Sequence, residues 1–179
     1  MSRGEIRAPD PLLEKVALSP MDFGSLVHAV LESRFKGGPC FVSSNILSRI
    51  RDEKAFQNLM AIAESMADSF LSSELGKRCT ASANRESEFP VLTAVKIEEK
   101  PIAITGQVDL LFMEKDEVVV VDFKTDSLER PQEHYAQLSA YCRAAGDIFG
   151  KPVSVWLFYL RSGRAVNVTE DIKELEYYT

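Results

Sequence analysis

The stretch "GQVDLLFMEKDEVVVVDFKTD", residues 106–126, decides the fold. Its apolar residues are largely β-branched and are interrupted once by a polar "EKDE", which is typical of two buried strands joined by a turn. A two-residue turn at Lys115 and Asp116 would pair Glu114 with Glu117. We therefore expect a β-hairpin, and the same register continued along both strands would place Asp109 opposite Asp122.

Two aspartates facing each other are costly. Opposed residues have Cβ atoms about 4.5–5.5 Å apart, and carboxylates about 5 Å apart repel by about 3 kcal/mol at an effective dielectric constant of about 20. A divalent cation would compensate, because carboxylate oxygens suit Mg²⁺ or Mn²⁺. Lys124 lies two residues after Asp122 and thus on the same face, within reach of a metal-bound water or a substrate phosphate.

The register depends on the turn, since a three-residue loop would turn one aspartate away unless a bulge restored it. Gly106, three residues before Asp109, favours either such a bulge or a close approach of substrate. In the alternative interpretation, Asp109 and Asp122 only cap strand ends and "KTD" begins a polar loop. The two acids and the lysine on one face together favour a metal site.

The rest of the chain predicts an α/β domain with a mixed sheet. Residues 1–17 resemble a flexible lead-in, and residues 18–179 form one domain. Ser19, Pro20 and Asp22 predict a helix start, with Leu18 and Phe23 as a staple across it and a stop at 37–38. Further expected elements are a short helix within 40–50, a helix over 53–75 with Gly76 as its stop, strands within 85–124, a helix opened by Pro131, and a strand pair from 153.

Composition restricts the class of protein. A hydrophobic content of 45% is that of a globular protein, and no apolar run approaches the roughly 20 residues of a membrane span. We therefore expect a cytoplasmic protein that does not bind membranes. Cys40, Cys79 and Cys142 lack metal-site spacing, so no iron–sulfur cluster held by this chain alone is expected. The net charge of −6 is unusual for a protein that binds nucleic acid unaided.

Five stretches in order carry a resemblance to a known family: "GSLVHAVLE", "EFPV", "GQVDLLF", "VVVDFKTD" and "YAQLSAY", spanning residues 24–141. They resemble the PD-(D/E)XK nuclease superfamily, whose signature is an acid on one strand and acid-x-lysine on the next. Within it they are similar to the RecB-like branch, the C-terminal nuclease domain of AddA-type and RecB-type helicase-nucleases. The resemblance implies a restriction-endonuclease-like mixed β-sheet flanked by helices.

The resemblance also implies a site. It makes His28, Asp109, Asp122 and the Phe123 carbonyl metal ligands, and it gives Lys124 the task of orienting the attacking water and stabilising the phosphate. Glu88 matches the acid of an E-x-P motif, and Gln137 with Tyr141 matches a Q-x-x-x-Y motif that would bind substrate. Taken alone, His28 fits a core histidine, Glu88 could pair with Arg85, and Tyr141 could be a core residue.

The activity implied is Mg²⁺-dependent hydrolysis of DNA phosphodiester bonds, with Mn²⁺ as an alternative metal and 5′-phosphate and 3′-hydroxyl products. The implied partner is a superfamily 1 helicase that feeds a single strand to the exonuclease during DNA repair or recombination. The motor would lie in the same polypeptide or in a separate one, because these residues contain no Walker A motif. The competing hypothesis is a catalytically silent nuclease-fold module that guides DNA or a partner subunit.

Overall fold

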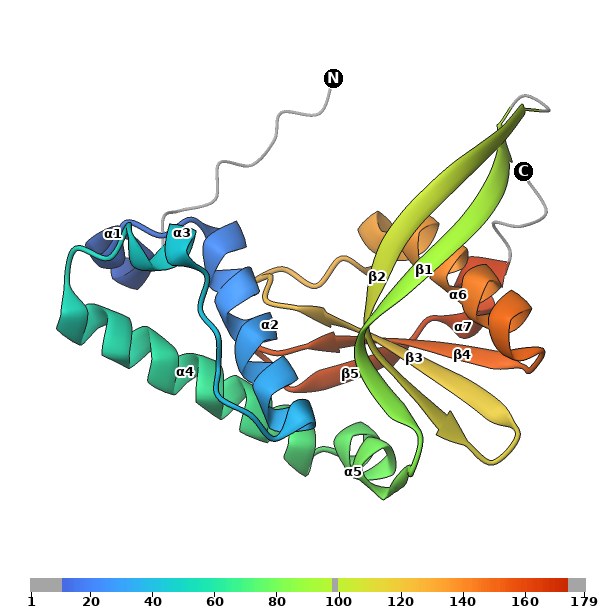
Figure 1. The fold of residues 1–179 in the computed structure, drawn as a ribbon, viewed down its shortest axis with the longest axis horizontal. Coiled ribbons are helices and arrows are strands. Elements are labelled where there is room, and N and C mark those ends of the chain that lie inside the picture. The colour runs from blue at the N-terminus through green and yellow to red at the C-terminus, as the bar shows by residue number, and fades with distance from the viewer. Residues whose placement is uncertain (1–10, 98–99, 174–179) are drawn as a thin grey trace.

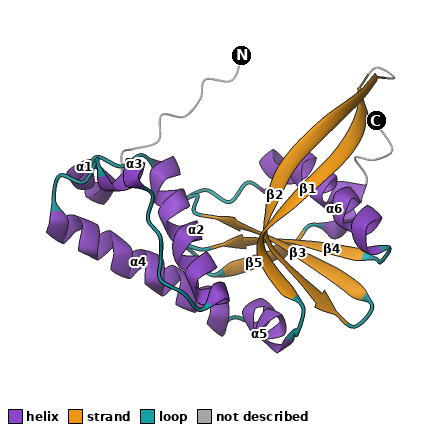
Figure 2. Ribbon diagram, viewed as in Figure 1, coloured by secondary structure: helices purple, strands orange, loops and turns teal. Residues whose placement is uncertain are grey.

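The structure, a computed structural model, describes residues 11–97 and 100–173 (Figure 1). The chain begins with helices, continues into three strands, and returns through a helix to two more strands (Figure 2). Its elements are α1 (Pro11–Val16), α2 (Pro20–Lys36), α3 (Ser44–Leu47), α4 (Glu53–Ser72), α5 (Glu74–Ala81), β1 (Arg85–Ile97), β2 (Lys100–Glu114), β3 (Glu117–Lys124), the 3₁₀ turn η1 (Pro131–His134), α6 (Tyr135–Phe149), β4 (Val153–Tyr159), β5 (Arg164–Asn167) and α7 (Thr169–Lys173).

The five strands form one mixed sheet in the order β1-β2-β3-β4-β5. The pairs β1–β2, β2–β3 and β4–β5 are antiparallel, whereas β3 and β4 run parallel because α6 crosses between them. The outer part of the β1–β2 pair extends beyond the sheet as a twisted ribbon (Figure 1). The expected α/β fold with a mixed, helix-flanked sheet in a single domain is confirmed.

The β2–β3 hairpin has the predicted register. Its pairs run from Glu114–Glu117 back to Leu110–Val121, so the two-residue turn is confirmed. Lys115 in that turn has a φ of 53°, the positive value that tight hairpin turns need at their first position. The pairing stops one step before Asp109 and Asp122, at the place where the two chains carry their acids.

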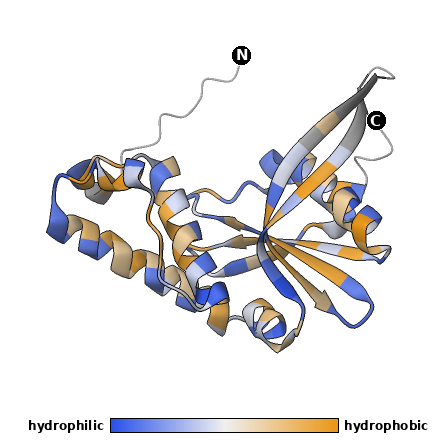
Figure 3. Ribbon diagram, in the orientation of Figure 1, coloured by the Kyte–Doolittle hydropathy of each residue, from blue (hydrophilic) through white to orange (hydrophobic). Residues whose placement is uncertain are grey.

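Strand β3 is apolar because both of its faces are buried. Val119 and Val121 face a core formed with α1, α2 and α4, whereas Val118 and Val120 face a second core formed with α6. Figure 1 shows the two helical groups on opposite sides of the sheet. The helices are amphipathic, and α4 alternates between hydrophobic and hydrophilic residues along its length (Figure 3). No helix in the described part of the chain is long and apolar enough to cross a membrane.

Helix α2 begins as predicted. The Ser19 hydroxyl accepts a bond from the backbone N–H of Asp22 at 3.1 Å, and the Asp22 carboxylate accepts the Ser19 N–H at 3.0 Å. Leu18 and Phe23 are both buried in the first core. The helix ends at Gly37, whose φ of 67° is the left-handed C-cap conformation.

Two boundaries differ from the expectation. Gly76 does not end the helix that begins at Glu53; Ser73 does so, and Gly76 lies inside α5. Its lack of a side chain lets α5 turn back against α4, because a Cβ there would collide with the Phe70 carbonyl oxygen. At the N-terminus, Leu13 and Val16 of α1 are buried in the first core, so packed structure starts before residue 18, while residues 1–10 lie outside the described part.

Candidate active site

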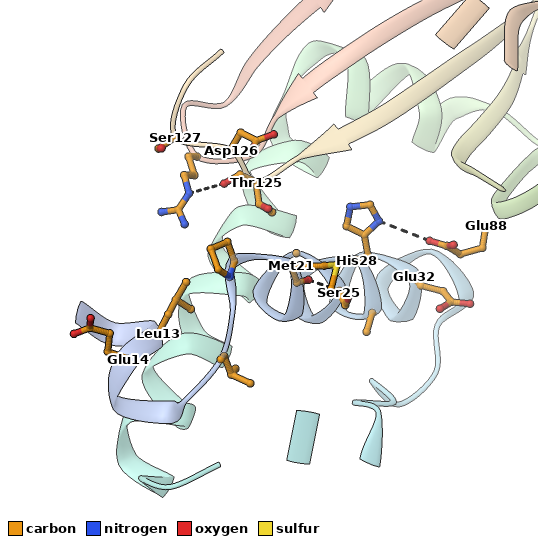
Figure 4. A pocket seen from close by; sticks show the side chains of 15 residues that line it. Leu13, Glu14, Met21, Ser25, His28, Glu32, Glu88, Thr125, Asp126 and Ser127 are labelled. Carbon is orange, nitrogen blue, oxygen red and sulfur yellow. Dashed lines mark hydrogen bonds and ion pairs between the residues drawn. The ribbon is translucent and has the colours of Figure 1, made fainter. Parts of the chain in front are cut away.

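A groove with a volume of about 1160 Å³ runs along α2. One face of this helix, with Met21, Ser25, His28 and Glu32 at helical spacing, forms one wall (Figure 4). Residues 125–127, which follow β3, form part of the opposite wall. The two walls touch at Gly24, where an added Cβ would lie 3.3 Å from the Thr125 hydroxyl oxygen. The groove therefore connects the helix that carries His28 with the end of the strand that carries Asp122.

His28, Glu88 and Asp109 converge at this groove from α2, β1 and β2. Nδ1 of His28 lies 3.4 Å from a carboxylate oxygen of Asp109 and 3.9 Å from one of Glu88. One possible ligand atom from each residue falls within 4.8 Å of the others. Within residues 11–97 and 100–173, this is the one group of three His, Cys, Asp or Glu side chains so placed. His28 is thus not an enclosed core histidine, and Glu88 faces His28 and Asp109 in place of Arg85.

Glu88 has an unusual backbone. Its φ of 55° lies in the left-handed region, and the β1–β2 pairing skips this residue between Ser87–Leu110 and Phe89–Val108. The side-chain amide of Gln107 donates to the Glu88 carbonyl at 3.0 Å. Such a conformation is costly for a residue other than glycine, and this bond helps to hold it. The interruption of the strand turns the Glu88 carboxylate toward the groove.

Asp109 occupies the matching gap between β2 and β3. Its carboxylate accepts the backbone N–H of Phe123 at 2.7 Å, a side-chain bond where the ladder of backbone pairs has ended. The Phe123 ring is anchored in the first core, with Phe70 at 4.7 Å between ring centroids, and its edge contacts His28. The backbone whose carbonyl the resemblance makes a metal ligand is therefore fixed to a second predicted ligand.

Asp122 is the most enclosed of the acids, with 3% of its surface exposed. Its carboxylate forms an ion pair of 2.7 Å with the Lys124 ammonium on the same strand face. Burial, together with the charge of Asp109, raises the pKa of Asp122 to about 6, although Lys124 and His28 act in the opposite direction. Asp122 is outside the ligand group of His28, Glu88 and Asp109, so the fourth acid position is adjacent to that group.

The other two titratable groups show the same excess of negative charge. Burial raises the pKa of Glu88, and the charge of Asp109 raises it further. Burial by itself lowers the pKa of His28, but its hydrogen bond with Asp109 and the charges of three neighbouring acids reverse the sign, so that the pKa of His28 is raised. The cluster therefore favours the binding of positive charge.

Gln137 and Tyr141 form a pair on α6, on the other side of the sheet from α2. The Gln137 amide donates to the Tyr141 hydroxyl at 2.8 Å, as their spacing of one helical turn predicts. The Tyr141 ring packs over Gly106, where an added Cβ would lie 2.6 Å from Cε1 of the ring. Gly106 thus makes room for Tyr141, and neither Gln137 nor Tyr141 lines the groove along α2.

A sheet with acids at the matched positions of three adjacent strands, an acid-x-lysine on the third and a groove over them has the architecture of restriction-endonuclease-like nucleases. The chain belongs to the PD-(D/E)XK nuclease superfamily, whose family model matches residues 3–178.

Curated relatives are named as one of the subunits of an ATP-dependent helicase/nuclease. Those from Bacillus cereus (strain AH820) and Bacillus mycoides (strain KBAB4) are 29% and 28% identical to this chain over 94% of its length. The chain spans only 16% of the length of these relatives. A solved protein from Eubacterium rectale, provisionally named an exonuclease, has a TM-score of 0.53 at 11% identity over 98% of this chain and 65% of that one. This last likeness confirms the fold.

Proposed function

We propose that this domain is a divalent-metal-dependent deoxyribonuclease that hydrolyses phosphodiester bonds of DNA, leaving 5′-phosphate and 3′-hydroxyl ends. The observation that carries the proposal is the convergence of His28, Glu88 and Asp109 beside the Asp122–Lys124 pair, from four different elements, at one groove. Superfamily membership supplies the reaction class, and the acids supply the site.

The donor set fits a hard divalent cation. One imidazole nitrogen and carboxylate oxygens suit Mg²⁺ or Mn²⁺, and the raised pKa values of Glu88 and Asp122 reflect crowded negative charge. We assign His28, Asp109, Asp122 and the Phe123 carbonyl as ligands, with Glu88 beside them. A cation bound there would polarise the scissile phosphate and stabilise the leaving oxygen.

The chain's own groups would do the rest. Lys124, 18% exposed and held by Asp122, is placed to orient the attacking water and to stabilise charge on the phosphate. Asp109 fixes the Phe123 backbone, and the Phe123 ring is anchored by Phe70, so the end of β3 is rigid. Gln137 and Tyr141 would contact substrate from the α6 side.

Substrate and partner follow from the relatives and from charge. The Bacillus relatives are named as subunits of an ATP-dependent helicase/nuclease, and the net charge of −6 offers few phosphate contacts. We infer that a helicase motor delivers single-stranded DNA to this domain, in DNA repair or recombination.

The test is cleavage of end-labelled single- and double-stranded DNA by the purified chain with Mg²⁺, Mn²⁺ or EDTA. Lys124→Gln and Asp122→Asn should abolish cleavage, whereas Lys115→Gln and Asp116→Asn, in the exposed turn of the same hairpin, should retain it. Circular dichroism confirms that each variant is folded. Undiminished cleavage by Lys124→Gln would refute the assignment; DNA binding by wild type with no cleavage under any metal would favour a silent guiding module.

A further inference from the structure

The groove that holds the candidate site is acidic, which is a problem for a substrate made of phosphates. Four of its lining residues carry carboxylates: Glu14, Glu32, Glu88 and Asp126. Among the lining residues within the described part of the chain, Arg161 is the only arginine or lysine. A DNA strand in this groove would therefore meet one permanent cation of the protein outside the metal cluster.

Arg161 belongs to the turn between β4 and β5, and two contacts fix it. Its Nε donates to the carbonyl oxygen of Thr125 at 2.6 Å, as the dashed line in Figure 4 shows. Its guanidinium lies over the ring of Phe23 on α2, 5.4 Å from the ring centroid. The side chain thus bridges both walls of the groove while remaining exposed to solvent.

Such a placement suits recognition of a phosphate. A guanidinium carries five N–H donors in a planar fork, so one bond to Thr125 orients the group without using its full capacity. Arginine forks match phosphate oxygens better than an ammonium does, and pre-orientation reduces the entropy lost on binding.

The position of Arg161 along the groove identifies the phosphate. Phe23, under the guanidinium, precedes His28 by five residues on α2, an axial separation of about 7.5 Å. That separation is comparable to one nucleotide step of an extended single strand. We propose that Arg161 binds the DNA backbone phosphate adjacent to the one that is cleaved. This inference rests on the proposed nuclease function.

The first experiment separates binding from chemistry. Affinity for a labelled single-stranded oligonucleotide is measured by fluorescence anisotropy in Ca²⁺ at several salt concentrations, and KM and kcat are measured in Mg²⁺. Arg161→Gln, which can still donate to Thr125, should weaken binding and raise KM about tenfold, change kcat little, and reduce the salt slope by about one. Arg161→Lys should recover part of the loss. Arg164→Ala is the control, since Arg164 pairs with Glu129 and does not line the groove.

The second experiment tests direct contact. Oligonucleotides that each carry one uncharged methylphosphonate are bound to wild type and to Arg161→Gln. The wild type should lose affinity when the linkage next to the cleaved one is neutral, and the variant should show no further loss there. An equal loss in both proteins would overturn the proposal, because Arg161 would then act only by holding residues 125–127. Wild-type binding without cleavage would refute the nuclease function while leaving this comparison decisive.

Discussion

Replacing Asp122 by asparagine should change how the stability of the metal-free protein depends on pH. The Asp122 carboxyl is 3% exposed, lies near Asp109 and has Lys124 as its nearest cation. Its pKa is raised from an ordinary 3.8 to about 6. The folded state therefore holds this proton more tightly than the unfolded state does.

The sign and size follow from linkage. Because the folded pKa lies above the unfolded one, the contribution of Asp122 to stability is complete below about pH 3.8 and is lost as the pH rises through about 6. The difference between the two pKa values corresponds to roughly 3 kcal/mol, at about 1.36 kcal/mol per pKa unit. Asparagine does not titrate, so Asp122→Asn should lack this loss. The difference in unfolding free energy, variant minus wild type, should therefore increase by up to about 3 kcal/mol between pH 4.5 and 7.5.

Urea unfolding in EDTA across that range measures this difference directly. A constant offset from the altered Lys124 contact cancels, because only the change with pH is compared. Asp116→Asn removes an exposed carboxylate of the same hairpin and controls for net charge. Parallel curves for wild type and Asp122→Asn would refute the reasoning, since they would mean that burial and Asp109 do not destabilise the charged form.

Three further substitutions test single contacts. Gly106→Ala should cost about 1–3 kcal/mol in urea unfolding, because the new Cβ would overlap the Tyr141 ring, and an unchanged midpoint would contradict that packing. Ser73→Ala should cost about 1 kcal/mol in thermal unfolding, because the Ser73 hydroxyl caps α5; a smaller loss than for an exposed serine-to-alanine control would argue against the cap. Gln107→Ala should weaken Mn²⁺ binding about tenfold in calorimetry by releasing the backbone of Glu88, and unaltered affinity would exclude Gln107 as a positioning residue.

The parts of the site that sequence could predict are those built on strict periods. A two-residue turn and a side-chain period of two place Asp122 and Lys124 on one face, and the structure joins them at 2.7 Å. A helical period likewise places Gln137 beside Tyr141. In each case the residues are close in sequence, so local geometry alone determines their distance.

The rest depends on contacts between distant segments. The ligand group joins α2, β1 and β2, and without the resemblance nothing in the letters around His28 distinguishes it from a core histidine. Arg161 reaches Thr125 and Phe23 only after β4 has paired with β3. The left-handed backbone of Glu88 had no local signal, because glutamate does not favour that conformation. Gly76 misled for a similar reason, since a glycine that ends a helix and one that permits close packing look alike in sequence.

The pairing of Asp122 with Lys124 also explains why the acid-x-lysine needs a buried strand end. In water such a pair contributes little, but with the carboxylate 3% and the ammonium 18% exposed neither charge is well solvated by itself. Lys124 therefore neutralises Asp122 until another cation does so. On the proposed function, we expect that compensation of Asp122 by a bound divalent ion leaves the ammonium to the substrate phosphate. Arginine would keep the charge, but its rigid fork, tied to the carboxylate by two bonds, would be harder to redirect.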